Sequence, residues 1–182
     1  MKTAVVFLAD GFEECEGLLV VDLLRRAGIH VITASVMGRK EILSSHQVTL
    51  LADACAEEVD FRNADVVVLP GGMPGTLNLQ ADETLAGALK KAAGTDTWIC
   101  AICAAPRVLG HYGLLEGQTA TCYPGCESYL TGAQTTENPV EVSGQFITSR
   151  GVGTAIPFAL KILEKLEGAE CAQKIEKSIV FG

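Results

Sequence analysis

One cysteine occupies a position from which a thiol can do chemistry. Cys103 follows the apolar run WICAI at 98–102 and precedes the segment AAP at 104–106, which predicts a buried strand followed by a helix. Small residues beside it allow a side chain to stand exposed on a sharp strand-to-helix turn, a nucleophile elbow. The positive end of the helix dipole favours a thiolate, so we expect a sulfur ionised near neutral pH. The alternative is a buried structural cysteine.

A glycine turn can supply the second part of such a site. Pro70, Gly71 and Gly72 end the apolar segment 65–69 abruptly. A backbone N–H of this turn, together with the amide of Ala104, would form an oxyanion hole. The alternative interpretation is a turn that only ends a strand.

Three acids near the first strand are candidates for the third part. Glu13, Glu14 and Glu16 follow the apolar run at 4–9. A carboxyl that faces the sulfur must be protonated to donate a hydrogen bond, because an ionised carboxylate would repel a thiolate. The other acids suit the start of a helix, where they stabilise the dipole. The local sequence does not say which of the three faces the sulfur.

The other cysteines raise metal and disulfide alternatives. Cys100 and Cys103 form a C-x-x-C pair, and Cys122 and Cys126 follow at a spacing close to that of a zinc ribbon. Cys100 lies inside the apolar run, however, and residues 100 and 103 on a strand would point to opposite faces. We therefore expect no metal and no other cofactor. The spacing leaves open a regulatory disulfide among Cys103, Cys122 and Cys126.

The positions of the histidines limit which classes of cysteine enzyme the chain can belong to. They stand at positions 30, 46 and 111, so no later loop can supply a histidine to a Cys–His dyad. A hydrolase that needs a histidine base is therefore disfavoured.

The bulk composition favours a single domain over 1–182. A net charge of −8 argues against a nucleic-acid partner and against an anionic membrane surface. The chain has no apolar run of transmembrane length and no signal peptide, so we expect a cytoplasmic protein. Its seven cysteines, an odd number, should then be mostly reduced thiols.

Alternating segments predict an α/β sandwich of three layers with a mostly parallel sheet. The strands are predicted at 4–9, 30–35, 65–69, 97–102 and 146–148, and the helices at 18–27, 84–93, 104–112 and 154–166. Segment 36–64 is less regular, and 44–52 is predicted to form an antiparallel hairpin arm. Ligands in such sheets bind beyond the carboxyl ends of the strands, where the candidate residues lie.

Four blocks of the chain resemble the ThiJ/PfpI superfamily, in particular the branch of the parkinsonism-associated protein deglycase. The blocks are GFEECE at 11–16, VLPGG at 68–72, AICAAP at 101–106 and TSRGVGT at 148–154. The resemblance covers the whole chain in order. It implies a flavodoxin-like sandwich and a homodimer formed through the region of the first helix.

The resemblance also implies the roles of the site residues. It assigns the reactive cysteine to Cys103, the partner carboxyl to Glu16, and the backbone amides to Gly72 and Ala104. Family members are described as glyoxalases that need no metal or glutathione, as deglycases of early glycation adducts, and as oxidation sensors or holdases. The expected substrate is a methylglyoxal-like aldehyde or a glycated protein, and the alternative is a thiol sensor or holdase without turnover.

Two departures from the family pattern bear on mechanism. Many members of the branch have a histidine in a Thr-His-Pro block, whereas Tyr123 occupies that position here. A phenol is a poor base at neutral pH but can donate a hydrogen bond, so Tyr123, with Gly71, is expected to bind substrate. In the intracellular-protease branch a histidine follows the cysteine directly; Ala104 stands there, which disfavours proteolysis.

Overall fold

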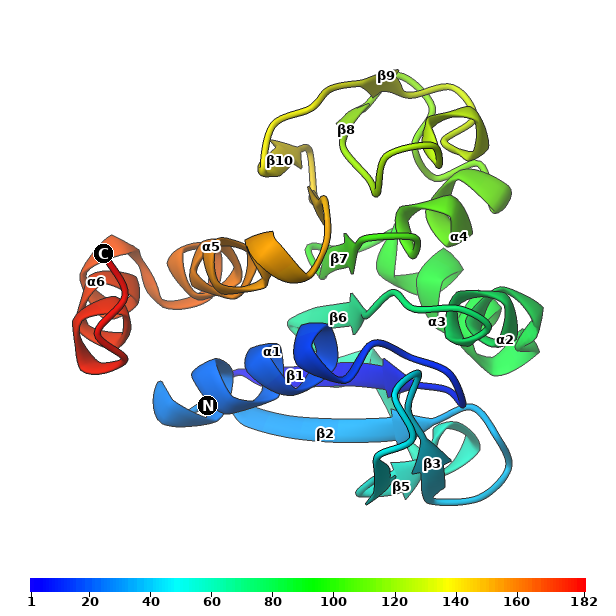
Figure 1. Ribbon diagram of the computed structural model, residues 1–182, viewed down its shortest axis with the longest axis horizontal. Coiled ribbons are helices and arrows are strands. Elements are labelled where there is room, and N and C mark those ends of the chain that lie inside the picture. Colours follow the sequence, from blue (N-terminus) through cyan, green and yellow to red (C-terminus); the bar gives the residue numbers. More distant parts are fainter.

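A seven-stranded sheet forms the centre of the computed structural model, which describes all 182 residues (Figure 1). The strand order is β10-β11-β7-β6-β1-β2-β5, and only the β10–β11 pair is antiparallel. In that order the strands span Val140–Ser143, Phe146–Ser149, Trp98–Ile102, Val66–Leu69, Thr3–Leu8, His30–Ser35 and Ala54–Cys55. The predicted mostly parallel α/β sandwich is confirmed.

Helices cover both faces of the sheet and thereby explain the apolar strands. All four residues of β6 are buried, and so are five of the six in β1. A strand that contacts helices on both sides needs apolar side chains in both orientations, so its sequence does not alternate. One face carries α1 (Glu14–Arg26), α5 (Ala155–Glu167) and α6 (Ala169–Ser178), and the other carries α2 (Gly75–Ala81), α3 (Glu83–Ala92) and α4 (Pro106–His111).

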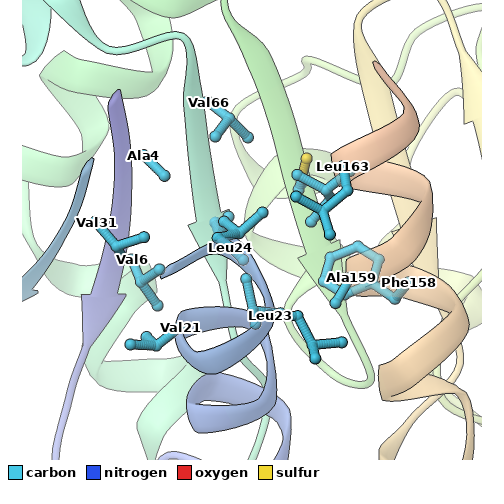
Figure 2. Close-up of a cluster of buried hydrophobic side chains, with 14 of the residues drawn as sticks. Ala4, Val6, Val21, Leu23, Leu24, Val31, Val66, Phe158, Ala159 and Leu163 are labelled. Atoms are coloured by element: carbon cyan, nitrogen blue, oxygen red, sulfur yellow. The ribbon is translucent and has the colours of Figure 1, made fainter. Parts of the chain in front are cut away.

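The core beneath α1 and α5 fixes these two helices against the sheet (Figure 2). Leu23 and Leu24 of α1 pack with Phe158 of α5 and Val6 of β1, and all four are almost completely buried. Burying each such side chain stabilises the fold by about 1.5–3 kcal/mol. The start of α1, which carries the candidate acids, is therefore held firmly over the sheet.

The predicted hairpin arm is confirmed, although it begins at Glu41 rather than at residue 44. Its strands are β3 (Glu41–Leu43) and β4 (Thr49–Leu51). The amide of Gly11 donates to the carbonyl of Leu43 at 2.7 Å, and the amide of Ser45 donates to the carbonyl of Phe12 at 2.8 Å. These bonds attach the arm to the loop between β1 and α1.

Several short elements were not predicted from the sequence. The segment between α4 and β10 contains β8 (Thr119–Ala120), a 3-10 turn at Glu127–Tyr129 and β9 (Gln134–Thr135). Further 3-10 turns lie at Ala56–Glu58, Phe61–Asn63 and Val152–Thr154. None of the helices has the length and apolar content needed to cross a bilayer.

Candidate active site

The loops after four neighbouring strands meet at one cavity. These loops follow β1, β6, β7 and β11, and the cavity between them measures about 530 Å³. Its lining residues are Glu13, Glu16, Gly72, Cys103, Tyr123, Pro124, Arg150, Gly151, Val152, Gly153 and Thr154. The cavity thus lies beyond the carboxyl ends of the strands, where the sequence predicts a ligand site.

Cys103 stands on the predicted elbow. Its φ of 63° lies in the left-handed region, which a residue with a side chain adopts only when its surroundings hold it there. The Cys103 amide donates to the carbonyl of Ser149 at 2.9 Å, and the amide of Tyr123 donates to the Cys103 carbonyl at 2.8 Å. Helix α4 begins only at Pro106, so the elbow is a separate strained turn ahead of a six-residue helix.

Glu16 is the one acid of the three that faces the sulfur. Its side chain is fully buried, and Oε2 accepts a hydrogen bond of 2.8 Å from the amide of Gly71. Cys103 Sγ and Glu16 Oε1 each lie 3.9 Å from the point where a Cβ on Gly151 would stand, so they face the same space. Burial raises the pKa of Glu16 to about 7, although its hydrogen bonds with Cys103 and the Gly71 amide lower it.

Glu13 and Glu14 belong to a different group. The hydroxyl of Ser45 donates to Glu13 Oε2 and to Glu14 Oε2, each at 3.1 Å. His46 Nδ1 lies 3.0 Å from Glu14 Oε1 and 3.5 Å from Glu13 Oε2. One ligand atom from each of the two acids and His46 lie within 4.8 Å of one another, a donor set that a divalent cation could use. Ser45 and His46 already account for the positions of both carboxyls.

The expectation of a sulfur ionised near neutral pH is wrong for Cys103 taken alone. Burial raises the pKa of the Cys103 thiol to about 12, and the negative charge of Glu16 is the next cause. The backbone N–H groups of Ala104 and Gly72 at the sulfur lower the pKa but do not outweigh these effects. The short helix α4 does not begin at Cys103, so its dipole contributes little.

The two residues therefore titrate as a pair. One proton leaves near pH 7 and the second leaves only near pH 12, because a second negative charge cannot be accommodated beside the first. Between these values the pair of Cys103 and Glu16 carries one negative charge and one proton, and the lower pKa of Glu16 places the charge on its carboxylate. Sulfur can attack as a thiolate whenever that proton is on the carboxyl.

The remaining predicted residues divide between the cavity and the layer behind it. Gly72 and Tyr123 line the cavity, and the side chain of Tyr123 is 53% exposed. Gly71 is not among the lining residues, and its amide donates to Glu16, so it supports the pair; its contact with a substrate stays a prediction. Ala104 contributes its amide at the sulfur. The resemblance block at 148–154 also contains Arg150 and Thr154, which line the cavity and which the sequence reasoning did not single out.

All seven cysteines are free thiols in this structure. Cys100 is completely buried in the core beneath α1 and α5, as expected for the middle of a strand. Cys122 is also buried, and Cys126 is half-buried. In the C-x-x-C pair, Cys100 therefore packs in the core, and Cys103 lines the cavity.

Fold and site together define a class of α/β proteins in which a cysteine on a strand-to-helix elbow meets a buried glutamate. The chain belongs to the DJ-1/PfpI family, whose model matches residues 2–165. The resemblance noted in the sequence is thereby confirmed.

Relatives cover nearly all of the chain. Protein dj-1beta of Drosophila melanogaster is 40% identical over 98% of this chain and 97% of its own length. Glutathione-independent glyoxalase DJR-1.2 of Caenorhabditis elegans is 31% identical over 98% and 96%. Protein DJ-1 homolog B of Arabidopsis thaliana is 39% identical over 96% of this chain, which spans only 40% of that protein. The solved structure of oxidized Toxoplasma gondii DJ-1 matches with a TM-score of 0.96 and 35% identity over the whole of both chains.

Replacing Gly71 with alanine should disrupt the pair. The added Cβ would stand 2.6 Å from Cys103 Cβ and 2.8 Å from Glu16 Oε2. We expect the free energy of unfolding, measured in urea, to fall by about 1–3 kcal/mol, because no side chain there can move aside freely. The matched control is Gly87→Ala in α3, where a Cβ meets open space and should stabilise by about 0.5–1 kcal/mol. Equal stability of the Gly71→Ala variant and the wild type would contradict this packing.

Proposed function

We propose that the chain is a cofactor-independent enzyme of the glyoxalase or deglycase type, acting on 2-oxoaldehydes such as methylglyoxal or on their early adducts with proteins. The observation that supports it most is the contact of Cys103 with Glu16 at the cavity, where a nucleophile and a proton carrier share one charge. The glyoxalase name of the Caenorhabditis elegans relative supports the same reaction class.

In the first step the Cys103 sulfur adds to the aldehyde carbon. A carbon–sulfur bond forms, and the electrons of the carbonyl double bond move to its oxygen. The backbone N–H groups of Gly72 and Ala104 are proposed to donate to this oxyanion. The proton that leaves the sulfur goes to Glu16 and then to the oxyanion, which gives a hemithioacetal and restores the carboxylate.

In the second step Glu16 transfers a proton between two carbons. The carboxylate removes the proton from the former aldehyde carbon and returns one to the neighbouring carbon. The hydroxyl proton of the hemithioacetal moves to the neighbouring carbonyl oxygen, so this carbon becomes a carbinol. The first carbon is oxidised to a thioester and the second is reduced, so no external oxidant is required. Water then hydrolyses the thioester, releases the 2-hydroxy acid and regenerates the Cys103 thiol. For a protein adduct, the amine or thiol leaves before this sequence begins.

Lactate formation tests the proposal. Purified protein, without glutathione or added metal, should convert methylglyoxal to lactate well above the rate in buffer, as followed by proton NMR. Lactate no faster than in buffer would refute the enzyme.

A thiol sensor is the second candidate, because the Toxoplasma relative has been solved in an oxidized form and Cys103 is half-buried at an open cavity. One peroxide would oxidise the thiol to a sulfenic acid, and a second would give a sulfinate, each releasing water. Intact mass after mild peroxide separates the two candidates. A stable gain of two oxygens on Cys103, in a protein that converts no dicarbonyl, would favour the sensor.

We also propose that residues 1–182 form one domain that works as a cytoplasmic homodimer. Exposed apolar side chains on α1 and the hairpin arm, including Leu18, Val48 and Leu51, support a self-association surface there. Sedimentation equilibrium should give twice the mass of the chain, and a monomer at micromolar concentration would contradict the dimer.

A further inference from the structure

Arg150 differs from every other arginine of the chain. The guanidinium groups of Arg25, Arg26, Arg39, Arg62 and Arg107 all donate hydrogen bonds to side chains or carbonyls. The Arg150 side chain forms no ion pair, and its Nη1 is sealed from water without any hydrogen-bond partner. Arg150 as a whole is half-buried, so only this nitrogen is closed to water. A guanidinium without a counter-ion is stabilised by an anion beside it.

No carboxylate of the chain forms an ion pair with the Arg150 guanidinium. The charge of Arg150 acts on the buried thiol of Cys122, yet burial raises the pKa of Cys122 to about 12. Cys122 is therefore a neutral thiol near pH 7 and does not balance the guanidinium. The charge of Arg150 is therefore not balanced by Cys122 or by an ion pair within the chain.

Arg150 lies at the candidate active site, so an anion that binds to it would lie there too. Arg150 lines the same cavity as Cys103 and is the only basic residue that does so. Its amide donates to Thr154 Oγ1 at 3.2 Å, and the preceding residue, Ser149, accepts the amide of Cys103 at 2.9 Å. The elbow and the backbone of Arg150 are thus held on adjoining strand ends, which places the arginine beside the elbow.

Two acids also face the cavity and limit where an anion can bind. Glu13 Oε2 accepts from Ser45 and lies beside His46, and Glu16 Oε2 accepts from the Gly71 amide. The Glu13 carboxyl is thus engaged on the α1 side, whereas Glu16 Oε1 has no hydrogen-bond partner and faces Cys103. An anionic group on a ligand would therefore be repelled there and attracted to Arg150.

We propose that Arg150 is a specificity-determining residue that binds a carboxylate of the substrate, so that the preferred substrates are 2-oxoaldehydes bearing a carboxylate. This inference rests on the proposed function. A cavity of about 530 Å³ has room for a molecule larger than methylglyoxal. A carboxylate brings one negative charge to one guanidinium and matches its planar donors, whereas a phosphate monoester brings about −1.5 to −2.

The test compares two substrates of equal chain length. In 4,5-dioxopentanoate the 2-oxoaldehyde carries a carboxylate, and in 2-oxopentanal it carries a methyl group; the products are 2-hydroxyglutarate and 2-hydroxypentanoate. A charge-assisted hydrogen bond predicts that wild type prefers the anionic substrate by about 10- to 100-fold in kcat/KM, mainly through KM.

Variants separate a local contact from overall charge. Arg150→Gln should bring the ratio of the two kcat/KM values close to one, and Arg150→Lys should keep part of the preference. Arg62→Gln, which removes the same charge at an exposed site, should leave the ratio as in wild type. A preference that persists in Arg150→Gln, or falls equally in Arg62→Gln, would overturn the inference.

The outcomes for the inference and for the proposed function are distinguishable. Equal kcat/KM for both substrates in wild type would overturn the role of Arg150 and leave the enzyme intact. If neither substrate is converted, the proposed function fails, and glutarate binding measured by calorimetry decides the inference. Binding lost in Arg150→Gln would then support a carboxylate site, and no binding to wild type would overturn it. Tighter binding of inorganic phosphate than of glutarate would also overturn the assignment.

Discussion

Replacing Cys103 with serine should abolish lactate formation from methylglyoxal. The hydroxyl keeps its proton at neutral pH and is a far weaker nucleophile than sulfur, so the hemithioacetal cannot form. We expect kcat/KM to fall by about a thousandfold or more, because loss of a nucleophile removes the whole covalent route. Initial rates of lactate release, with the variant at high concentration, measure this loss.

A second cysteine provides the matched control. Cys171 lies on α6, on the helix layer away from the cavity lining, and is half-buried like Cys103. Cys171→Ser should convert methylglyoxal at the wild-type rate. Substantial turnover by Cys103→Ser would remove the covalent mechanism, whatever the other variants show.

Replacing Glu16 with glutamine should lower kcat by about 100- to 10,000-fold, the range typical of a lost general acid–base group. The amide has nearly the same shape and can still contact the Gly71 amide through its oxygen, but it cannot carry a proton between two carbons. Addition of the thiol also loses its proton acceptor, so methylglyoxal should add to the peptide that contains Cys103 more slowly than in wild type. Stopped-flow kinetics and peptide mass spectrometry measure the two effects.

Glu14→Gln is the control for Glu16→Gln. Glu14 stands two residues away on the same helix but contacts Ser45 and His46, outside the cavity lining. Its variant should turn over like wild type. If Glu14→Gln were as impaired as Glu16→Gln, the effect would reflect the start of α1 and not a proton carrier at the sulfur.

The parallel sheet could be predicted because its strands carry a direct signal. The segments at β1, β6 and β7 are continuous apolar runs, which only a strand covered on both faces requires. The two-residue strands β8 and β9 carry no such run, since few of their side chains are buried. The first helix begins at Glu14, whereas the sequence predicted a start at Leu18. Acids fill the first turn of this helix, so the apolar periodicity becomes visible only after it.

The candidate site was only partly predictable. Cys103 could be found because a small-residue elbow after a buried strand is a local pattern. The identity of the inward acid depends on helix rotation: Glu14 and Glu16 are two positions apart and face different directions, a difference that appears only once the start of α1 is known. The sequence shows neither the burial of Cys103 nor the charge beside it, so the direction of its pKa was missed.

Arg150 could not be found from the sequence for a similar reason. Its distinguishing property is a guanidinium without an ion pair, with one buried nitrogen that has no partner, and this depends on the residues packed around it. The only local signal is its place directly after a strand, β11, that ends at the same edge as the elbow.

The alkylation rate of Cys103 as a function of pH tests most directly whether the thiol and Glu16 share one ionisation. Loss of the first proton of the pair allows the sulfur to react, so the rate with iodoacetamide should rise with pH through one inflection near pH 7 in wild type. In Glu16→Gln that inflection should be absent, since the group that releases the proton is gone. A wild-type rate that rises only near pH 9, as for an isolated thiol, or an inflection near pH 7 that survives in Glu16→Gln, would contradict the account.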